Sequence, residues 1–119
     1  MAESSKGYGE TIIQSVKKQD GITVVTVVGD IDLMHSLRFQ SELSDIVHST
    51  EQKIVMILSA VPYMDSSGIA SLVKLLSECR EKKVELALVG MTERVRGMFE
   101  IMRLDSMFKM FESIDEAMV

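Results

Sequence analysis

The sequence predicts an α/β fold: a mixed sheet of four to five strands that opens with an antiparallel hairpin. The hairpin is predicted from Thr11–Val16 and the β-branched run Ile22–Val28, with a polar turn at Lys17–Gly21 between them. We expect Ile22–Val28 to be buried on both faces or nearly so. After it, short apolar runs alternate with helix-periodic segments, which predicts parallel strands joined by right-handed crossovers.

Apolar spacing places the next elements. A helix over Met34–His48 is predicted because Phe39, Leu43, Ile46 and Val47 share one face. The runs Lys53–Leu58 and Val84–Val89 read as buried strands. The helix between them ends near Arg80–Lys83 and carries an apolar stripe of Ile69, Leu72, Val73, Leu76 and Cys79.

The last thirty residues predict one more strand between two helices. Thr92 is expected to cap a helix whose apolar face holds Val95, Met98, Phe99 and Met102. Phe108–Phe111 is a candidate short edge strand. Ser113 and Glu116 match a capping box, with Ser113 at N-cap and Glu116 at N3 of a final short helix.

Composition limits the kinds of partner that we expect. We predict one domain over residues 10–119 after a flexible polar tail, residues 1–9. A net charge of −5 argues against direct binding of nucleic acid. One cysteine allows no internal disulfide, and no Cys/His cluster indicates a metal or other cofactor. No apolar run approaches the ~20 residues of a membrane span, so we expect a cytoplasmic protein without a membrane partner.

Three loops are predicted to meet at one edge of the sheet. The second, third and fourth strands run parallel, so their carboxyl ends point the same way. This gathers Gly29–Asp32, Tyr63–Gly68 and Gly90–Arg94 at the edge where α/β sheets form their sites. We therefore expect Asp30, Asp32 and Ser66 to be neighbours.

Ser66 lies where a strand passes into a helix. Free backbone N–H groups at such a position would tolerate a phosphate on an exposed hydroxyl. The simplest interpretation is a helix cap, because Asp65, Ser66 and Ser67 all suit the N-cap position. No His partners the serines as a base, and His35 is expected to be a surface or capping residue, so we predict that the protein is not an enzyme.

The acidic residues leave two functional interpretations open. Asp30, Asp32 and Asp65 could form a divalent-ion pocket in a receiver-like domain that carries an aspartyl phosphate. They could instead belong to a protein surface that presents a serine to the ATP of another protein. The opening hairpin, and the lack of a lysine after the fourth strand, argue against a receiver.

Two motifs carry a resemblance to a known family. Met64-Asp65-Ser66-Ser67-Gly68 after an apolar strand, together with Gly29-Asp30-Ile31-Asp32, resembles the anti-sigma factor antagonists of the STAS domain family. The resemblance covers about Thr11 to Met118. One departure is Ser67-Gly68-Ile69-Ala70, where the family often has Ser-Gly-Leu-Gly.

The resemblance implies a switch between binding partners. An anti-sigma factor that is also a serine kinase, supplying ATP and Mg²⁺, would phosphorylate Ser66, with Ser67 the less favoured acceptor. The unphosphorylated antagonist would bind that kinase and free a sigma factor, and a serine phosphatase would reset it. A scaffold that is never phosphorylated is the alternative within the family.

The same resemblance suggests a contact surface for the partner, on a monomer or weak dimer. Asp32 matches the family's loop Asp beside the phosphorylated serine. The expected contact residues are Asp30, Asp32, Leu33, Met64, Asp65, Ser66, Ser67, Gly68, Met91, Thr92 and Arg94.

Overall fold

A computed structural model describes residues 10–119, and the predicted tail, residues 1–9, lies outside the described part. These residues form a sheet in the order β1-β2-β3-β4-β5, with helices between and after the strands, which confirms the predicted α/β fold. The elements are β1 Ile13–Gln19, β2 Ile22–Val28, α1 Leu33–His48, β3 Lys53–Ala60, α2 Ser66–Lys82, β4 Glu85–Val89, α3 Glu93–Ile101, β5 Lys109–Phe111 and α4 Ile114–Met118.

The opening hairpin is confirmed, but its first strand lies further along the chain than predicted. β1 pairs antiparallel with β2 as far as Gln19 opposite Ile22, so the turn is only Asp20-Gly21, with φ of 56° and 81°. β1 is an edge strand of the sheet, and its later side chains are exposed to water. Polar residues such as Lys17 therefore remain in the strand without a burial penalty, and their polarity did not mark its end.

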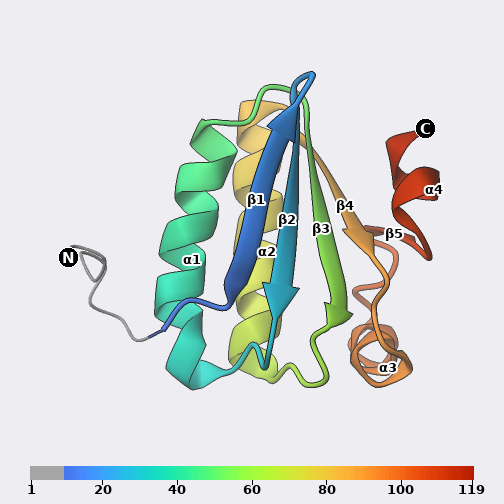
Figure 1. The fold of residues 1–119 in the computed structure, drawn as a ribbon. Helices are drawn as coiled ribbons and strands as arrows, with labels where there is room; N and C mark the ends of the chain where they lie inside the picture. The colour runs from blue at the N-terminus through green and yellow to red at the C-terminus, as the bar shows by residue number, and fades with distance from the viewer. Residues whose placement is uncertain (1–9) are drawn as a thin grey trace.

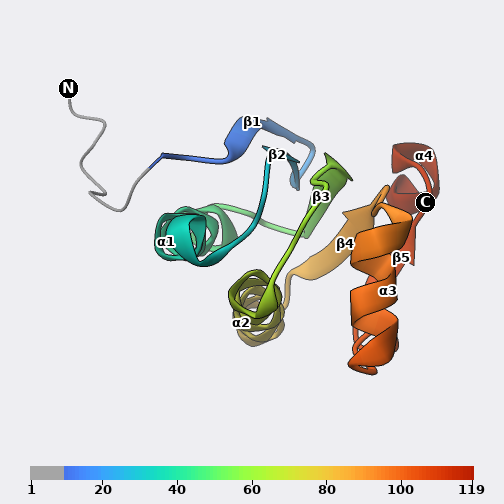
Figure 2. The same ribbon diagram turned by 90° about the horizontal axis from the view of Figure 1, so that it is seen from below.

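The helices form a layer on each side of the sheet. Figure 1 shows α1 and α2 side by side behind the strands, and Figure 2 shows α4 on the opposite side. β2 to β5 are parallel, so the ends of β2, β3 and β4 point to one edge, at the bottom of Figure 1. The main core lies between the sheet and α1 and α2, around Phe39, Met56, Leu72, Leu88 and Phe99.

The prediction that β2 is buried on both faces was wrong. Val25 and Val27 belong to the main core, whereas Ile22 and Val24 on the other face are only half-buried. The reason is the short α4, whose Ala117 packs on the part of this face formed by Val55, Ala87 and Val89. A groove of about 300 Å³ remains open beside it, with Ile22, Val24, Ile57, Ile114 and Met118 among its lining residues.

The predicted helices are confirmed with small shifts at their ends. α1 begins at Leu33, β3 continues to Ala60, and α2 ends at Lys82 with Lys83 in the left-handed region. Cys79 is buried in the core, and this burial raises the pKa of its thiol to about 11. No helix formed by residues 10–119 has the length and apolarity to cross a membrane.

The C-terminal elements follow the prediction except at one methionine. Val95 and Phe99 of α3 are buried, and the Phe99 ring meets Phe108 edge-on at 5.4 Å between centroids. Met102 is exposed, because α3 ends at Ile101 and the chain turns away through Arg103 at φ 59°. Ser113 caps α4 by accepting the Glu116 N–H.

Candidate interaction site around Ser66

The two motif loops are joined by backbone hydrogen bonds beyond the ends of β2 and β3. Ile31 donates its N–H to the Tyr63 carbonyl at 3.1 Å, and its own carbonyl accepts the Asp65 N–H at 3.2 Å. Ile31 and Met64 form a parallel bridge, and both side chains are fully buried. Two segments that are more than thirty residues apart in the sequence therefore form one hydrogen-bonded unit at the edge that faces the viewer in Figure 2.

Asp65 connects these loops through its side chain and begins α2 as its N-cap. Its Oδ1 accepts the N–H groups of Ser67 and Gly68 at 2.9 and 3.1 Å and the Ser67 hydroxyl at 2.6 Å. Its Oδ2 accepts the Leu33 N–H, at the start of α1, at 3.3 Å. The Ser67 hydroxyl, above all, and the N–H groups stabilise the carboxylate, and they lower the pKa of Asp65 below its ordinary value of 3.8.

Gly68 is required by how closely the two loops approach. A Cβ on this residue would lie 2.2 Å from the Ile31 carbonyl oxygen and 2.7 Å from Met64 Cγ. The first of these atoms belongs to the backbone and cannot move aside cheaply. Gly68 is therefore needed for packing space; its φ is not in the left-handed region.

The two adjacent serines differ in their surroundings. Ser66 is the first residue of α2 and is exposed, and its hydroxyl makes no hydrogen bond within residues 10–119. Ser67 is half-buried, and its hydroxyl donates to Asp65. Two of the free N–H groups expected at this helix start are occupied, because the Asp65 carboxylate accepts those of Ser67 and Gly68.

The other acidic residues lie on the first motif loop. Asp32 is the N-cap of α1 and accepts from the His35 N–H at 3.2 Å, and its Oδ1 lies 2.7 Å from His35 Nδ1. Asp30 is half-buried. Within residues 10–119, no three carboxylate, His or Cys side chains gather as a metal site, so Asp30, Asp32 and Asp65 do not form the divalent-ion pocket considered above.

The Asp32–His35 pair was not predicted from the sequence. Its signal is the Asp-x-x-His spacing at the start of a helix, where the N-cap side chain faces the third helical residue.

The third loop reaches the site through its helix. Arg94 lies over the Tyr63 ring, with the guanidinium carbon 5.3 Å from the ring centroid. Thr92 caps α3 by accepting the Val95 N–H at 3.2 Å, and Met91 is half-buried against the core. The structure thus brings the three predicted loops to one edge, with the first two in direct hydrogen-bonded contact.

An exposed apolar patch lies in the first turns of α1, next to the hydrogen bond between the Leu33 N–H and Asp65. Leu33, Met34 and Leu37 are 74%, 80% and 61% exposed. Leu33 was predicted as a contact residue from the sequence, whereas Met34 and Leu37 were not. The available signal is their position outside the core stripe of α1, which runs through Ser36, Phe39 and Leu43. Large apolar side chains that a helix leaves in water are typical of a protein-binding surface.

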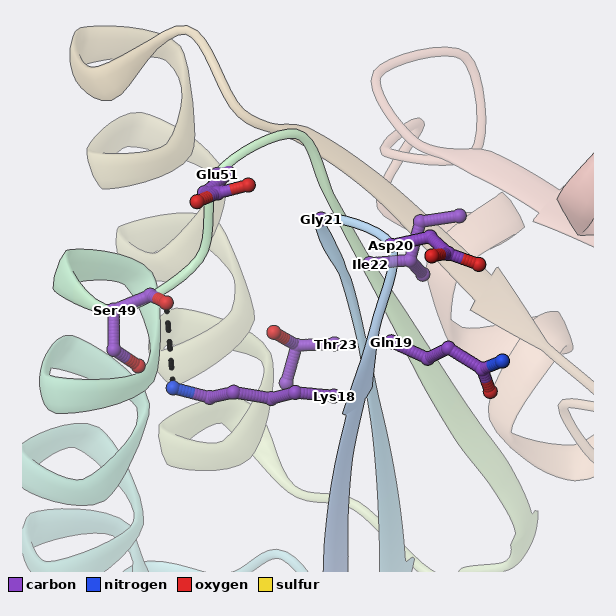
Figure 3. A pocket seen from close by; sticks show the side chains of 8 residues that line it. All are labelled: Lys18, Gln19, Asp20, Gly21, Ile22, Thr23, Ser49 and Glu51. Carbon is purple, nitrogen blue, oxygen red and sulfur yellow. Dashed lines mark hydrogen bonds between the residues drawn. The ribbon is translucent and has the colours of Figure 1, made fainter.

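A separate hollow lies at the opposite end of the sheet from Ser66. Figure 3 shows it between the β1–β2 turn and the segment after α1, with a volume of about 220 Å³. Lys18 crosses it and donates to the Ser49 carbonyl at 3.3 Å, at the C-terminal end of α1. A cation at a helix C-terminus satisfies a free carbonyl, so Lys18 has a structural explanation.

One curated relative matches most of the chain. An anti-sigma-F factor antagonist, RsfB of Mycobacterium tuberculosis, is 26% identical over 112 residues, which span 92% of this chain and 88% of that protein.

Two solved structures share the fold. An anti-sigma factor antagonist from Mycobacterium paratuberculosis aligns with a TM-score of 0.78 at 24% identity, over 87% of this chain and 88% of its own. The phosphorylated form of SpoIIAA from Bacillus aligns with a TM-score of 0.68 at 17% identity, over 87% and 95%. The STAS domain family itself matches residues 14–117. This chain, with its hairpin, its joined motif loops and its match over nearly the whole length, belongs to the STAS domain family.

Proposed function

We propose that this protein is an anti-sigma factor antagonist that is switched by phosphorylation of Ser66. The observation that carries the proposal is the exposed, unbonded Ser66 hydroxyl at the first residue of α2, on a rigid edge beside an apolar patch. The curated relative RsfB is named as an antagonist of an anti-sigma factor. Residues 10–119 would act as a single regulatory STAS domain in the cytoplasm, where sigma factors work.

The contact surface that we propose surrounds Ser66. It combines the exposed patch of Leu33, Met34 and Leu37 with polar residues of the three loops, namely Asp30, Asp32, Asp65, Ser66, Ser67, Thr92 and Arg94. Met91 would contribute its half-exposed side chain. Met64 and Gly68 are buried beneath this surface, so we assign them a supporting role.

The partner would supply the chemistry of phosphorylation. An anti-sigma factor with serine kinase activity would bind ATP and Mg²⁺ and transfer the γ-phosphoryl group to Ser66 Oγ, with release of ADP and the hydroxyl proton. The antagonist contributes a hydroxyl held at a fixed place by the helix start and the joined loops. A serine phosphatase would remove the phosphate.

Phosphorylation would weaken binding through charge. It adds about −1.5 to −2 charges next to the Asp65 carboxylate. Because Asp65 already uses the N–H groups of Ser67 and Gly68, the helix start has little left to neutralise a phosphate. An unpaired charge in a protein interface costs several kcal/mol, and ~3 kcal/mol corresponds to about a hundredfold loss of affinity.

Intact mass and peptide mapping of the protein isolated from its own cells test this function. We expect one phosphate on Ser66, removed by phosphatase treatment, and none on the Ser66→Ala variant. Ser67→Ala is the matched control and should keep its phosphate. A wild-type protein that carries no phosphate under any growth condition would favour the scaffold alternative, and a phosphate on an aspartate would favour the receiver-like one.

A further inference from the structure

We infer that Asp65 determines which of the two adjacent serines receives the phosphate, by engaging the Ser67 hydroxyl and leaving that of Ser66 available. This inference rests on the proposed function, because it concerns the selectivity of the same phosphorylation. Asp65 would be a positioning residue, since its contacts are with Ser67, Gly68 and Leu33 and not with the reacting oxygen of Ser66.

The contrast between the serines is one of hydrogen bonding and exposure. The Ser67 Oγ lies 2.6 Å from Asp65 Oδ1, at the short end of the range for a hydroxyl bonded to a carboxylate. A kinase must bring the serine oxygen in line with the γ-phosphorus and take up its proton. Ser67 would have to break a charge-assisted bond and rotate out of a half-buried position. Ser66 needs neither step.

Asp65 is itself held so that it keeps this contact. Its Oδ1 accepts two backbone N–H groups of α2 in addition to the Ser67 hydroxyl, and its Oδ2 accepts the N–H of Leu33 at the start of α1. A carboxylate fixed from both helices cannot turn away from Ser67. The same bonds disfavour its protonated form, so Asp65 is a poor base and does not activate the Ser67 hydroxyl that it binds.

The first test maps the phosphate in Asp65 variants made in the source cells. Asp65→Ala removes the acceptor, and Asp65→Asn keeps a capping oxygen but loses the charge and the acceptor for Leu33. We expect the ratio of phospho-Ser67 to phospho-Ser66 to rise about tenfold or more in Asp65→Ala, the scale of losing a hydrogen bond to a charged group, and by less in Asp65→Asn. Ser113→Ala, which removes the cap of the remote α4, should leave the ratio unchanged.

The second test needs no kinase. Proton exchange of the serine hydroxyls, followed by NMR, should be slow for Ser67 and fast for Ser66 in the wild-type protein, and fast for both in Asp65→Ala. Equal exchange of the two hydroxyls in the wild type would overturn the inference. So would phosphate that stays on Ser66 alone in both Asp65 variants. Wild-type protein without any phosphate would instead refute the proposed function, with the exchange result still deciding the role of Asp65.

Discussion

The starts of α2 and α3 lie at the same edge of the sheet and are built differently. Asp65 caps α2 and also reaches the first residue of α1, whereas Thr92 caps α3 through one bond to Val95 of its own first turn. The glycines of the two helices show the same contrast. A Cβ on Gly68 would lie 2.2 Å from a backbone oxygen, whereas one on Gly97 would meet nothing within 4 Å.

This difference shows which of the two helix starts is held by contacts with another segment of the chain. The start of α2 is shared between two loops, so a change there alters how Ser66 and the patch on α1 are presented together. The cap of α3 is a bond within its own first turn, so its loss should leave the joined loops in place. The tight construction therefore coincides with the part of the proposed contact surface around Ser66, whereas Thr92 and Arg94 belong to the part at the start of α3.

The largest expected effect comes from exchanging the two glycines for alanine. Gly68→Ala forces the joined loops apart, so we expect a loss of about 2–3 kcal/mol or more in the free energy of unfolding, as for overpacked cores. Gly97 is half-buried within α3, and an added Cβ there would meet nothing within 4 Å, so we expect Gly97→Ala to gain roughly 0.5–1 kcal/mol in the free energy of unfolding. Chemical denaturation of both variants measures the difference. Equal stability of the two would show that the close approach at Gly68 is absent.

A smaller effect is expected from pH, because the N-cap of α2, Asp65, is ionisable and the N-cap of α3, Thr92, is not. The pKa of Asp65 is lowered in the folded protein, so its ionised form stabilises the fold. The ionised carboxylate makes its full contribution to stability above pH 3.8, the ordinary pKa of the group. This contribution disappears as the pH falls through the lowered pKa that Asp65 has in the folded protein. The wild-type protein should therefore exceed Asp65→Asn in free energy of unfolding by a smaller amount below about pH 4 than at neutral pH.

Thr92→Ala is the matched control for this titration. Its cap carries no ionisable group, so we expect a loss of about 1 kcal/mol that does not change with pH. Unfolding measured by circular dichroism between neutral and acidic pH compares the two variants. A constant gap for Asp65→Asn would mean that hydrogen bonding does not lower the pKa of Asp65.

The periodic elements of this fold could be predicted because their burial is encoded locally. The core stripe of α1 repeats at the helical spacing, and β3 is a continuous apolar run that is buried on both faces. Both were predicted within two residues. The end of β1 was missed because an edge strand faces water, so Lys17 and Lys18 carry no signal against it. The half-open face of β2 depends on how little of it the short α4 covers, which no local pattern shows.

The site could be predicted as a set of loops and not as a set of contacts. The parallel order of strands placed Asp32, Asp65 and Ser66 at one edge. Which serine hydroxyl is bonded depends on which residue becomes the N-cap of α2, and Asp65, Ser66 and Ser67 all suit that position. With Asp65 as the N-cap, its carboxylate accepts the Ser67 hydroxyl two residues on and leaves that of Ser66 free, so two neighbouring serines with the same local propensity have different surroundings.

The most direct test of the switch compares Ser66→Asp and Ser66→Ala in titration calorimetry with the partner anti-sigma factor. Ser66→Asp adds a negative charge beside Asp65 while both variants keep the fold, which circular dichroism checks. We predict that Ser66→Ala binds like the unphosphorylated wild-type protein and that Ser66→Asp binds at least about tenfold more weakly, since it carries less charge than a phosphate. Equal affinities for the two variants would contradict the claim that charge at the start of α2 controls the partner.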